Sequence, residues 1–439
     1  MGLMHTPMVR TLLVANLLAL LASYWWSWSW SWPTVLFGEA GLVLLVLMPL
    51  CRKKQQSSPL DPHFAGVPVP RFRSDLLKVE NIAGIQMGGC TATDGSAAAS
   101  SLSSSWCCIP HPAKAHRGGE DAVFVTPWSV GCADGVGGWA ARGIDSGLYA
   151  RGLMHGCERA ANDGQGLLRD ESGASEAGGV GGRSGGGLST ATMEGVAEQL
   201  NPVRLLKAGY DGVQRQHIIG STTACVATYL PLPAGQPAAS DSKGAVGTVQ
   251  VANLGDSGCM VIRDGRMVLR TVEQTHAFNF PRQLGTGSQD TPADADRLSI
   301  PVQPGDIVVL GTDGLFDNMF DDEILQLVNE NTKKQSEQPR GEEGGTKMHA
   351  GNAFPAAGNP SEAKQFAGIA RELAIEAYGR ACDRTRISPF VRRGVEAGCL
   401  DGAKVAAGAH CGGKVDDITC VLCRCDVAGA KPEPETPRK

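Results

Sequence analysis

Short apolar runs alternate with helix-like stretches over residues 115–426. Runs of about four to eight apolar and β-branched residues bounded by glycine predict strands. Such runs occupy residues 128–135, 220–230, 247–258, 305–314 and 416–425. Between two further apolar runs, Asp264-Gly265 predicts a two-residue hairpin turn. Strands interspersed with helices in this way predict a single α+β domain.

Helices are predicted where apolar residues recur at roughly every third or fourth position. One begins at Pro202, since Asn201 is a suitable N-cap and proline favours the first helical position. Two others begin at Asp321 and Ser361. Glycine-rich or polar stretches interrupt the domain, and the elements resume after each one. We therefore interpret them as surface insertions, near residues 163–192, 232–245 and 333–359.

The N-terminal residues 1–56 form a different region, which is hydrophobic and rich in tryptophan. Glu39 is the only charged residue between Arg10 and Arg52. This length can cross a bilayer, and tryptophan suits its interface, so we expect a membrane anchor. A cleavable targeting leader is the alternative. The composition of residues 57–114 predicts a flexible linker, and that of residues 427–439 a disordered tail.

Composition limits the classes of function. The net charge of −5 gives no electrostatic reason to expect binding to nucleic acid. Most of the fourteen cysteines stand alone in apolar runs, and only Cys420–Cys425 contains a CxxC with a third cysteine close by. No second pair or histidine spacing typical of a zinc site accompanies it. We therefore expect reduced, buried thiols.

Acidic residues mark the ends of the predicted strands. Asp134 and Asp313 each end an apolar run and precede a glycine. The acidic pairs Glu120–Asp121 and Asp416–Asp417 instead precede an apolar run. If the strand after Asp416 runs antiparallel to the strands that end at Asp134 and Asp313, all these carboxylates meet at one edge of the sheet.

Clustered carboxylates repel one another and retain protons unless a cation neutralises them. Oxygen ligands without nearby histidine or cysteine favour Mg²⁺ or Mn²⁺ over zinc. Two such ions about 3.5–4 Å apart can share a bridging water, lower its pKa and bind the oxygens of a phosphoryl group in transfer. Residues 135–138 lack the alternating donors of an EF-hand loop, and no Gly-Lys-Ser/Thr follows a glycine-rich turn, which excludes a P-loop.

Seven segments carry a resemblance to a known family. In chain order they are GGEDAVFV, GCADGVGGW, STTACVATYL, ANLGDSGCMVIRDG, QTHAFNFPRQL, GDIVVLGTDGLFDNM and GGKVDDITCVL. Together they resemble the metal-dependent type 2C (PPM) Ser/Thr protein phosphatases, and more narrowly the branch known from mitochondria and plastids. The resemblance covers residues 118–426. It implies a central antiparallel β-sandwich flanked by helices on both sides, in a monomeric catalytic domain.

The resemblance also implies roles for the acidic residues. Asp134 would bridge two metal ions, and Gly135 would supply a backbone carbonyl. Asp313 and Asp416 would complete the shell of one ion, which makes Asp134, Asp313 and Asp416 the catalytic set. Glu120–Asp121 would hold the waters of the other ion.

Two further acids and one segment have secondary roles by the same resemblance. Asp417 would orient waters, and Asp256 would be structural and hydrogen-bonded. The segment 274–284 would line the substrate entrance; the alternative is that Phe278 and Phe280 pack in the core.

The chain departs from the wider family at two places. Many members carry a histidine, proposed to protonate the leaving oxygen, where this sequence has Val136. The arginine that binds substrate phosphate lies upstream of the first acidic pair in the family. Arg117 is our candidate for it, with Lys114 and His116 as alternatives.

The resemblance implies a protein serine/threonine phosphatase that hydrolyses phosphoserine and phosphothreonine by attack of a hydroxide bridging two Mg²⁺ or Mn²⁺ ions. The alternative is a catalytically inactive phosphatase fold that acts as a regulatory or membrane-tethered binding protein, but none of the expected acids is missing. We expect a phosphoprotein substrate, no nucleic acid, and membrane contact through the N-terminal segment. The expected location is a membrane or, after cleavage of a leader, the mitochondrion or plastid.

Overall fold

The computed structural model describes residues 82–90, 101–173, 190–232, 244–337 and 360–426, all within the compact unit Val69–Lys439. The predicted anchor or leader at residues 1–56 and the predicted tail at residues 427–439 lie outside the described residues. Among the described helices, none combines the length and the apolar character needed to cross a bilayer.

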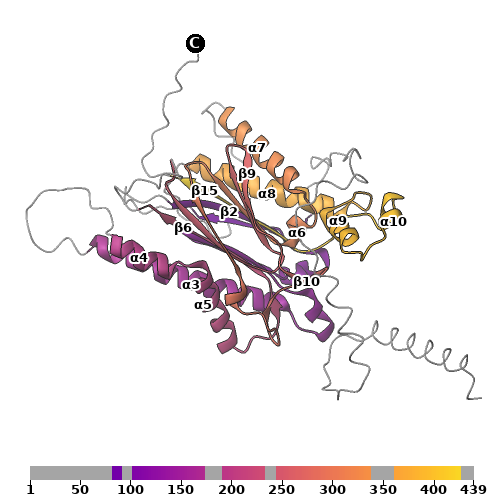
Figure 1. The fold of residues 1–439 in the computed structure, drawn as a ribbon, viewed down its shortest axis with the longest axis horizontal. Helices are drawn as coiled ribbons and strands as arrows, with labels where there is room; N and C mark the ends of the chain where they lie inside the picture. The colour runs from indigo at the N-terminus through magenta and orange to yellow at the C-terminus, as the bar shows by residue number, and fades with distance from the viewer. Residues whose placement is uncertain (1–81, 91–100, 174–189, 233–243, 338–359, 427–439) are drawn as a thin grey trace, which may run out of the picture. The chain divides into compact units, whose positions relative to one another are not determined.

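Two antiparallel sheets form the centre of the domain (Figure 1). One has the strand order β1-β2-β15-β14-β8-β9, and the other has the order β13-β7-β6-β4-β3. The strands of the first sheet are β1 (Gln86–Cys90), β2 (Ser101–Ile109), β8 (Gly258–Arg263), β9 (Arg266–Arg270), β14 (Ile307–Gly311) and β15 (Ile418–Asp426). Those of the second are β3 (Asp121–Val125), β4 (Ser129–Asp134), β6 (Ala224–Pro231), β7 (Gly247–Leu254) and β13 (Asp296–Val302). Two short pairs, β5 (Ser221–Thr222) with β12 (Leu284–Gly285) and β10 (Thr275–Ala277) with β11 (Phe280–Pro281), lie outside these sheets.

Helices cover the outer face of each sheet. In the five-stranded sheet α3 contacts β3 and β4, and in the six-stranded sheet α8 contacts β2 and β15. The helices are α3 (Ser146–Gly173), α4 (Thr190–Gln199), α5 (Pro202–Arg215), α6 (Asp313–Phe316), α7 (Asp321–Glu337), α8 (Pro360–Cys382), α9 (Pro389–Glu396) and α10 (Gly402–Ala406). The 3₁₀ helices among the described residues are η4 (Pro112–Arg117), η5 (Gly137–Arg142) and η6 (Pro292–Asp294). The predicted α+β sandwich with helices on both sides is confirmed.

The alternation of side chains along β14 shows how the two layers of core arise. Val308 and Leu310 belong to the apolar cluster between the sheets, whereas Ile307 and Val309 belong to the cluster under α7 and α8. Successive side chains of a strand point to opposite faces, so a strand buried on both faces is apolar throughout.

The structure confirms the predicted hairpin turn and the predicted starts of three helices. Asp264 and Gly265 join β8 to β9 with φ values of +49° and +75°, which suits the primed turns of two-residue hairpins. The Asn201 side chain accepts from the backbone N–H of Val203 at 3.0 Å, and α5 begins at the predicted Pro202. Helices α7 and α8 also begin at or next to the predicted residues.

The predicted linker at residues 57–114 is wrong for its C-terminal part. Strand β2 lies inside the six-stranded sheet and pairs antiparallel with β15 along its whole length. The serines of this segment are typical of a polar linker, yet Ser104 and Ser105 are buried. Small polar side chains fit into a strand that is covered on both faces. The sequence of such a strand therefore lacks the alternation of apolar and polar residues that predicts a strand.

The predicted insertions are also too broad at their helical ends. Helix α3 continues through Gly173 and α4 starts at Thr190, so part of 163–192 is helical. Helix α7 likewise extends to Glu337, inside the stretch 333–359. The central parts of the three insertions lie outside the described residues.

The twelve cysteines whose side chains the structure describes form no disulfide, and nine of them are buried. Burial raises the pKa of thiols such as Cys132, Cys157 and Cys225 above the ordinary value. Protonated, inaccessible thiols are unreactive, as expected for cysteines that serve as small apolar core residues.

Candidate metal centre

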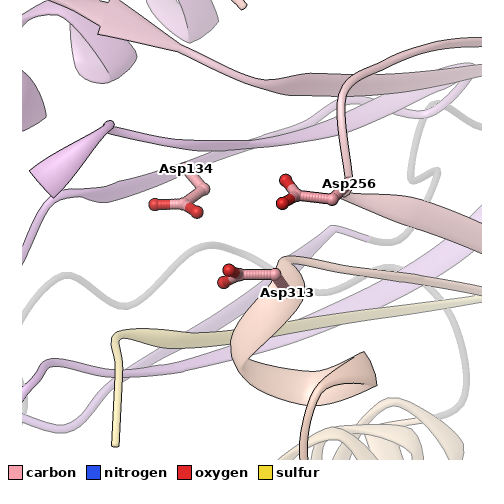
Figure 2. A group of neighbouring side chains, drawn as sticks. All are labelled: Asp134, Asp256 and Asp313. Carbon is pink, nitrogen blue, oxygen red and sulfur yellow. The ribbon is translucent and has the colours of Figure 1, made fainter. Parts of the chain in front are cut away.

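Three aspartates converge at one end of the sandwich. Asp134 ends β4, Asp256 follows β7, and Asp313 opens α6. Each offers a carboxylate oxygen, and these three oxygens all lie within 4.8 Å of one another. Figure 2 shows the Asp256 carboxylate directed toward Asp134, with Asp313 below them. We call Asp134, Asp256 and Asp313 the open group.

The sequence predicted that the acids meet at one edge of a single sheet, and this prediction is wrong. Asp134 follows a strand of the five-stranded sheet, whereas Asp313 follows a strand of the six-stranded sheet. Strands β14 and β15 are antiparallel neighbours as predicted, but β4 belongs to the opposite layer. The acids therefore meet across the two layers, at a common end of the sandwich.

Backbone contacts fix the position of Asp134. Its carbonyl accepts hydrogen bonds from Thr222 Oγ1 at 2.6 Å and from the Thr223 N–H at 2.9 Å. The next residue must be glycine, because a Cβ on Gly135 would lie 2.7 Å from the carbonyl oxygen of Glu120. That approach is closer than real Cβ contacts allow, so Gly135 is needed for packing whatever its carbonyl binds.

The environment of the open group suits a hard cation. Removal from water raises the pKa of Asp134 and of Asp256, and repulsion from Asp313 raises both further. The Oδ1 atoms of Asp256 and Asp313 are buried and have no hydrogen-bond partner. Buried, unpartnered oxygens that face one another fit a divalent ion with oxygen ligands, such as Mg²⁺ or Mn²⁺. No histidine or cysteine belongs to the group within the described part of the chain.

Lys114 neutralises a second set of acids. Its Nζ lies 2.6 Å from Glu120 Oε2 and 2.9 Å from Asp417 Oδ2. Asp416 Oδ1 is more distant, at 3.7 Å. The backbone N–H of His111 also donates to Asp417, at 2.8 Å. Glu120 and Asp417, both buried, are thus held by charges within the fold.

Lys414 neutralises a third set. Its Nζ binds Asp313 Oδ2, lies 2.8 Å from Asp317 Oδ2 and lies 3.4 Å from Asp416 Oδ2. Burial alone would lower the pKa of Lys414, but Asp313, Asp317 and Asp416 outweigh it and raise the pKa well above its ordinary value. Arg393 also binds Asp317. We call Asp313 Oδ2, Asp317, Lys414 and Arg393 the lysine-held group.

The positions of Lys414 and Asp256 in these groups were not predicted from the sequence. Lys414 stands two residues before the acidic pair in GGKVDDIT, a basic residue beside a predicted acid cluster. Asp256 was expected to be hydrogen-bonded, which is wrong for its Oδ1 atom. It follows an apolar strand and precedes small residues, the same pattern that marked Asp134 and Asp313.

The other predicted residues lie around the open group. Asp121 opens β3 opposite Asp134 in the ladder, and its Oδ2 accepts from Thr312 Oγ1 at 2.8 Å. Arg117 is partly exposed, and its Nη2 lies 2.6 Å from Glu120 Oε1. Its role as a phosphate ligand stays a prediction, as do the roles of Glu120, Asp121 and Asp416.

The segment 274–284 lies beside the open group. The Gln274 N–H donates to the carbonyl of Gly255, next to Asp256, at 2.8 Å. Phe278 packs against Phe390 of α9 in a tilted arrangement with ring centroids 5.0 Å apart, and Phe280 is 38% exposed. Core packing is therefore wrong for Phe280, and a place for the segment at the substrate entrance stays a prediction.

Val136 sits in a turn that is connected to the same segment. Its N–H donates to the carbonyl of Ser221 at 2.9 Å. Trp139 Nε1 donates to Ser221 Oγ at 2.6 Å, and that hydroxyl donates to Gln283 Oε1 at 2.6 Å. These bonds hold the turn after Asp134 against the strand pair β5 and β12.

Comparison with known proteins gives a consistent set of relatives. The family model described as Stage II sporulation protein E (SpoIIE) matches residues 186–342. The chain is 33% identical over 326 residues to "Probable protein phosphatase 2C 55" of Arabidopsis thaliana, covering 73% of this chain and 51% of that protein. It is 32% identical over 326 residues to "Protein phosphatase PTC7 homolog fig" of Drosophila erecta, covering 72% of this chain and 78% of that protein.

A solved structure agrees with the fold. The X-ray structure of the photosystem II phosphatase PBCP matches with a TM-score of 0.50 and 26% identity, over 74% of this chain and 98% of that one. The chain spans about half the length of the Arabidopsis and rice relatives that it matches.

Proposed function

The chain belongs to the PP2C (PPM) family of protein phosphatases, and from this premise we propose that it hydrolyses phosphoserine and phosphothreonine in proteins with the help of divalent cations. The observation that carries the proposal is the open group. Its three carboxylates converge, and two buried oxygens in it lack any partner. An inactive binding protein would have no need to keep these acids together at the cost of their mutual repulsion.

Different residues of the chain would have different roles in the reaction. Asp134, Asp256 and Asp313 would hold the cation. When bound, Mg²⁺ or Mn²⁺ lowers the pKa of an attacking water and stabilises charge on the phosphoryl oxygens. Arg117, with its side chain 29% exposed, would bind the substrate phosphate. Val136 has no proton to give, so the leaving oxygen must take its proton from solvent or from another group.

We further propose two ions in each site, with Asp134 common to both. Gly135 and the pair Glu120–Asp121 would serve one ion, while Asp313 and Asp416 would serve the other, with Asp256 beside Asp313 as a further ligand. The position of Asp121 opposite Asp134 in the strand ladder supports this arrangement. So does Asp416, whose Oδ1 accepts from the Asp417 N–H at 2.9 Å but whose Oδ2 lies 3.4 Å from Lys414, beyond a normal hydrogen bond.

Hydrolysis of a phosphopeptide by purified protein in Mn²⁺ tests the activity. We expect EDTA to abolish it, and Asp134→Asn to reduce kcat on the order of 1000-fold, about 4 kcal/mol of transition-state stabilisation. Asp211→Asn is the matched control, because the Asp211 side chain is 41% exposed and pairs with Lys207 on a helix away from the open group. Full activity of Asp134→Asn, or activity in EDTA, would rule out the proposed mechanism.

We propose a location from the N-terminal sequence alone. The hydrophobic, tryptophan-rich residues 1–56 would anchor the protein to a membrane or direct it to the mitochondrion or plastid. Fusing residues 1–60 to a fluorescent reporter separates the two, since an anchor stays attached and a leader is cleaved. A diffuse, uncleaved reporter would contradict both.

A further inference from the structure

Lys414 is held in place by more than its charge. Its backbone N–H donates to Asn318 Oδ1 at 2.9 Å, and its carbonyl accepts from Asn318 Nδ2 at 2.8 Å. Its Nζ lies 5.4 Å from the centre of the Phe390 ring. A single amide thus fixes both backbone groups of Lys414, so the fold directs the ammonium to one position.

The ammonium of Lys414 lies between two carboxylates that are close together in the sequence. The Lys414 ammonium contacts Asp313 and Asp317, which lie four residues apart at the start and just past the end of α6. Both carboxylates are almost completely buried. Two buried carboxylates at this spacing would repel each other without a cation between them.

The two cations of the lysine-held group face more than two acids. Lys414 contacts Asp313 and Asp317 and lies 3.4 Å from Asp416 Oδ2, and Arg393 pairs with Glu273 as well as with Asp317. The ammonium nevertheless occupies the place between Asp313 and Asp317, where a divalent ion would otherwise have to bind. In the described residues, neither Asp134 nor Asp256 has an ion pair within 4.0 Å. Asp313 belongs to both groups, with Oδ2 on Lys414 and Oδ1 buried without a partner.

We propose that the ammonium of Lys414 is a resident cation of the metal centre, which fills the space between Asp313 and Asp317 and closes it to a divalent ion. The proposal rests on the proposed function, since it takes the open group as the place where divalent ions bind. Lys414 then acts as a positioning residue. It leaves only the Oδ1 side of Asp313 available to an ion and sets the number of ions that the protein binds.

Calorimetric titration of the whole protein with Mn²⁺ tests the proposal. In Lys414→Met the side chain keeps a similar length but loses its charge, and we expect one more Mn²⁺ per chain than in the wild type. In EDTA this variant should unfold at a lower temperature, and Mn²⁺ should restore more of its stability than it adds to the wild type. Lys404→Met is the control, because Lys404 is exposed and pairs only weakly with Asp401.

An unchanged number of ions in Lys414→Met would overturn the proposal, because a merely structural lysine alters stability and not the Mn²⁺ count. If that variant does not fold, the number of Mn²⁺ ions bound by Asp317→Asn, which keeps Lys414, provides a second test. We expect Asp317→Asn to bind as many ions as the wild type, and loss of one ion would overturn the proposal. A wild type that binds no Mn²⁺ would instead overturn the proposed function, and this inference with it.

Discussion

The two oxygens of Asp313 face two groups that are built in different ways. On the Oδ2 side, Lys414 and Arg393 neutralise Asp313 and Asp317 from within the chain. On the Oδ1 side, Asp134 and Asp256 have no such partner in the described structure, and buried oxygens remain unpaired. A fold can therefore keep buried acids either by supplying its own cations or by leaving room for an ion from solution, and this site does both.

The largest effect should come from removing a charge on the Oδ1 side. Asp256→Asn keeps the size of the side chain, and we expect it to weaken Mn²⁺ binding by roughly 100-fold or more, since even outer-sphere partners of a metal are worth about 10–100-fold. Calorimetry measures the affinity, with Asp211→Asn as the control. Unchanged affinity would mean that Asp256 is structural and that the open group is smaller than described.

The next largest effect should follow from disturbing the packing behind the lysine-held group. A Cβ on Gly314 would collide with the carbonyl oxygen of Asp417, which belongs to the backbone and not to a flexible side chain. We expect Gly314→Ala to lower the free energy of unfolding by about 1–3 kcal/mol. Gly368→Ala is the matched control, because Gly368 faces open space in α8 and alanine should stabilise the helix by about 0.5–1 kcal/mol. Equal stabilities in urea unfolding would contradict the close packing.

A smaller effect is expected at the substrate side of the open group. Arg117→Met should raise KM for a phosphopeptide about tenfold, because a hydrogen bond between two charged groups contributes about 1.5–3 kcal/mol. Metal affinity should stay the same. Arg159→Met, at an exposed position of α3, serves as the control. If KM does not change, Lys114 or His116 becomes the better candidate for the phosphate ligand.

The smallest effect concerns the pH dependence of stability without metal. Burial, followed by repulsion from Asp313, raises the pKa of Asp416 to about 6 from an ordinary 3.8. The folded state then binds a proton more tightly than the unfolded state, so stability in EDTA should fall as pH rises from about 4 to about 6. Thermal unfolding across this range should show a shallower slope for Asp416→Asn than for the wild type. Parallel slopes would show that Asp416 is not perturbed.

Much of this architecture could be predicted because strands and turns leave local signals. Asp134 and Asp313 were found because each ends an apolar run and precedes glycine, a pattern that needs no knowledge of distant contacts. Lys414 was missed because its partners Asp313 and Asp317 are about a hundred residues away in sequence. Strand β2 was missed for a related reason, since serines in a buried strand lack the alternating apolar pattern. The assignment of Asp134 and Asp313 to different sheets likewise depends on tertiary pairing, which periodicity does not encode.

Strand β15 has a consequence for how the chain reaches its folded state. It lies between β14 and β2, and its pairing with β2 joins residues more than 300 positions apart, as at Cys107 and Cys420. During synthesis β2 and β14 leave the ribosome well before β15, so their facing edges stay open until the last strand arrives. Such long-range closure is slow, and open edges invite pairing with other chains. Completion of the six-stranded sheet, from β2 to β14, therefore waits for β15.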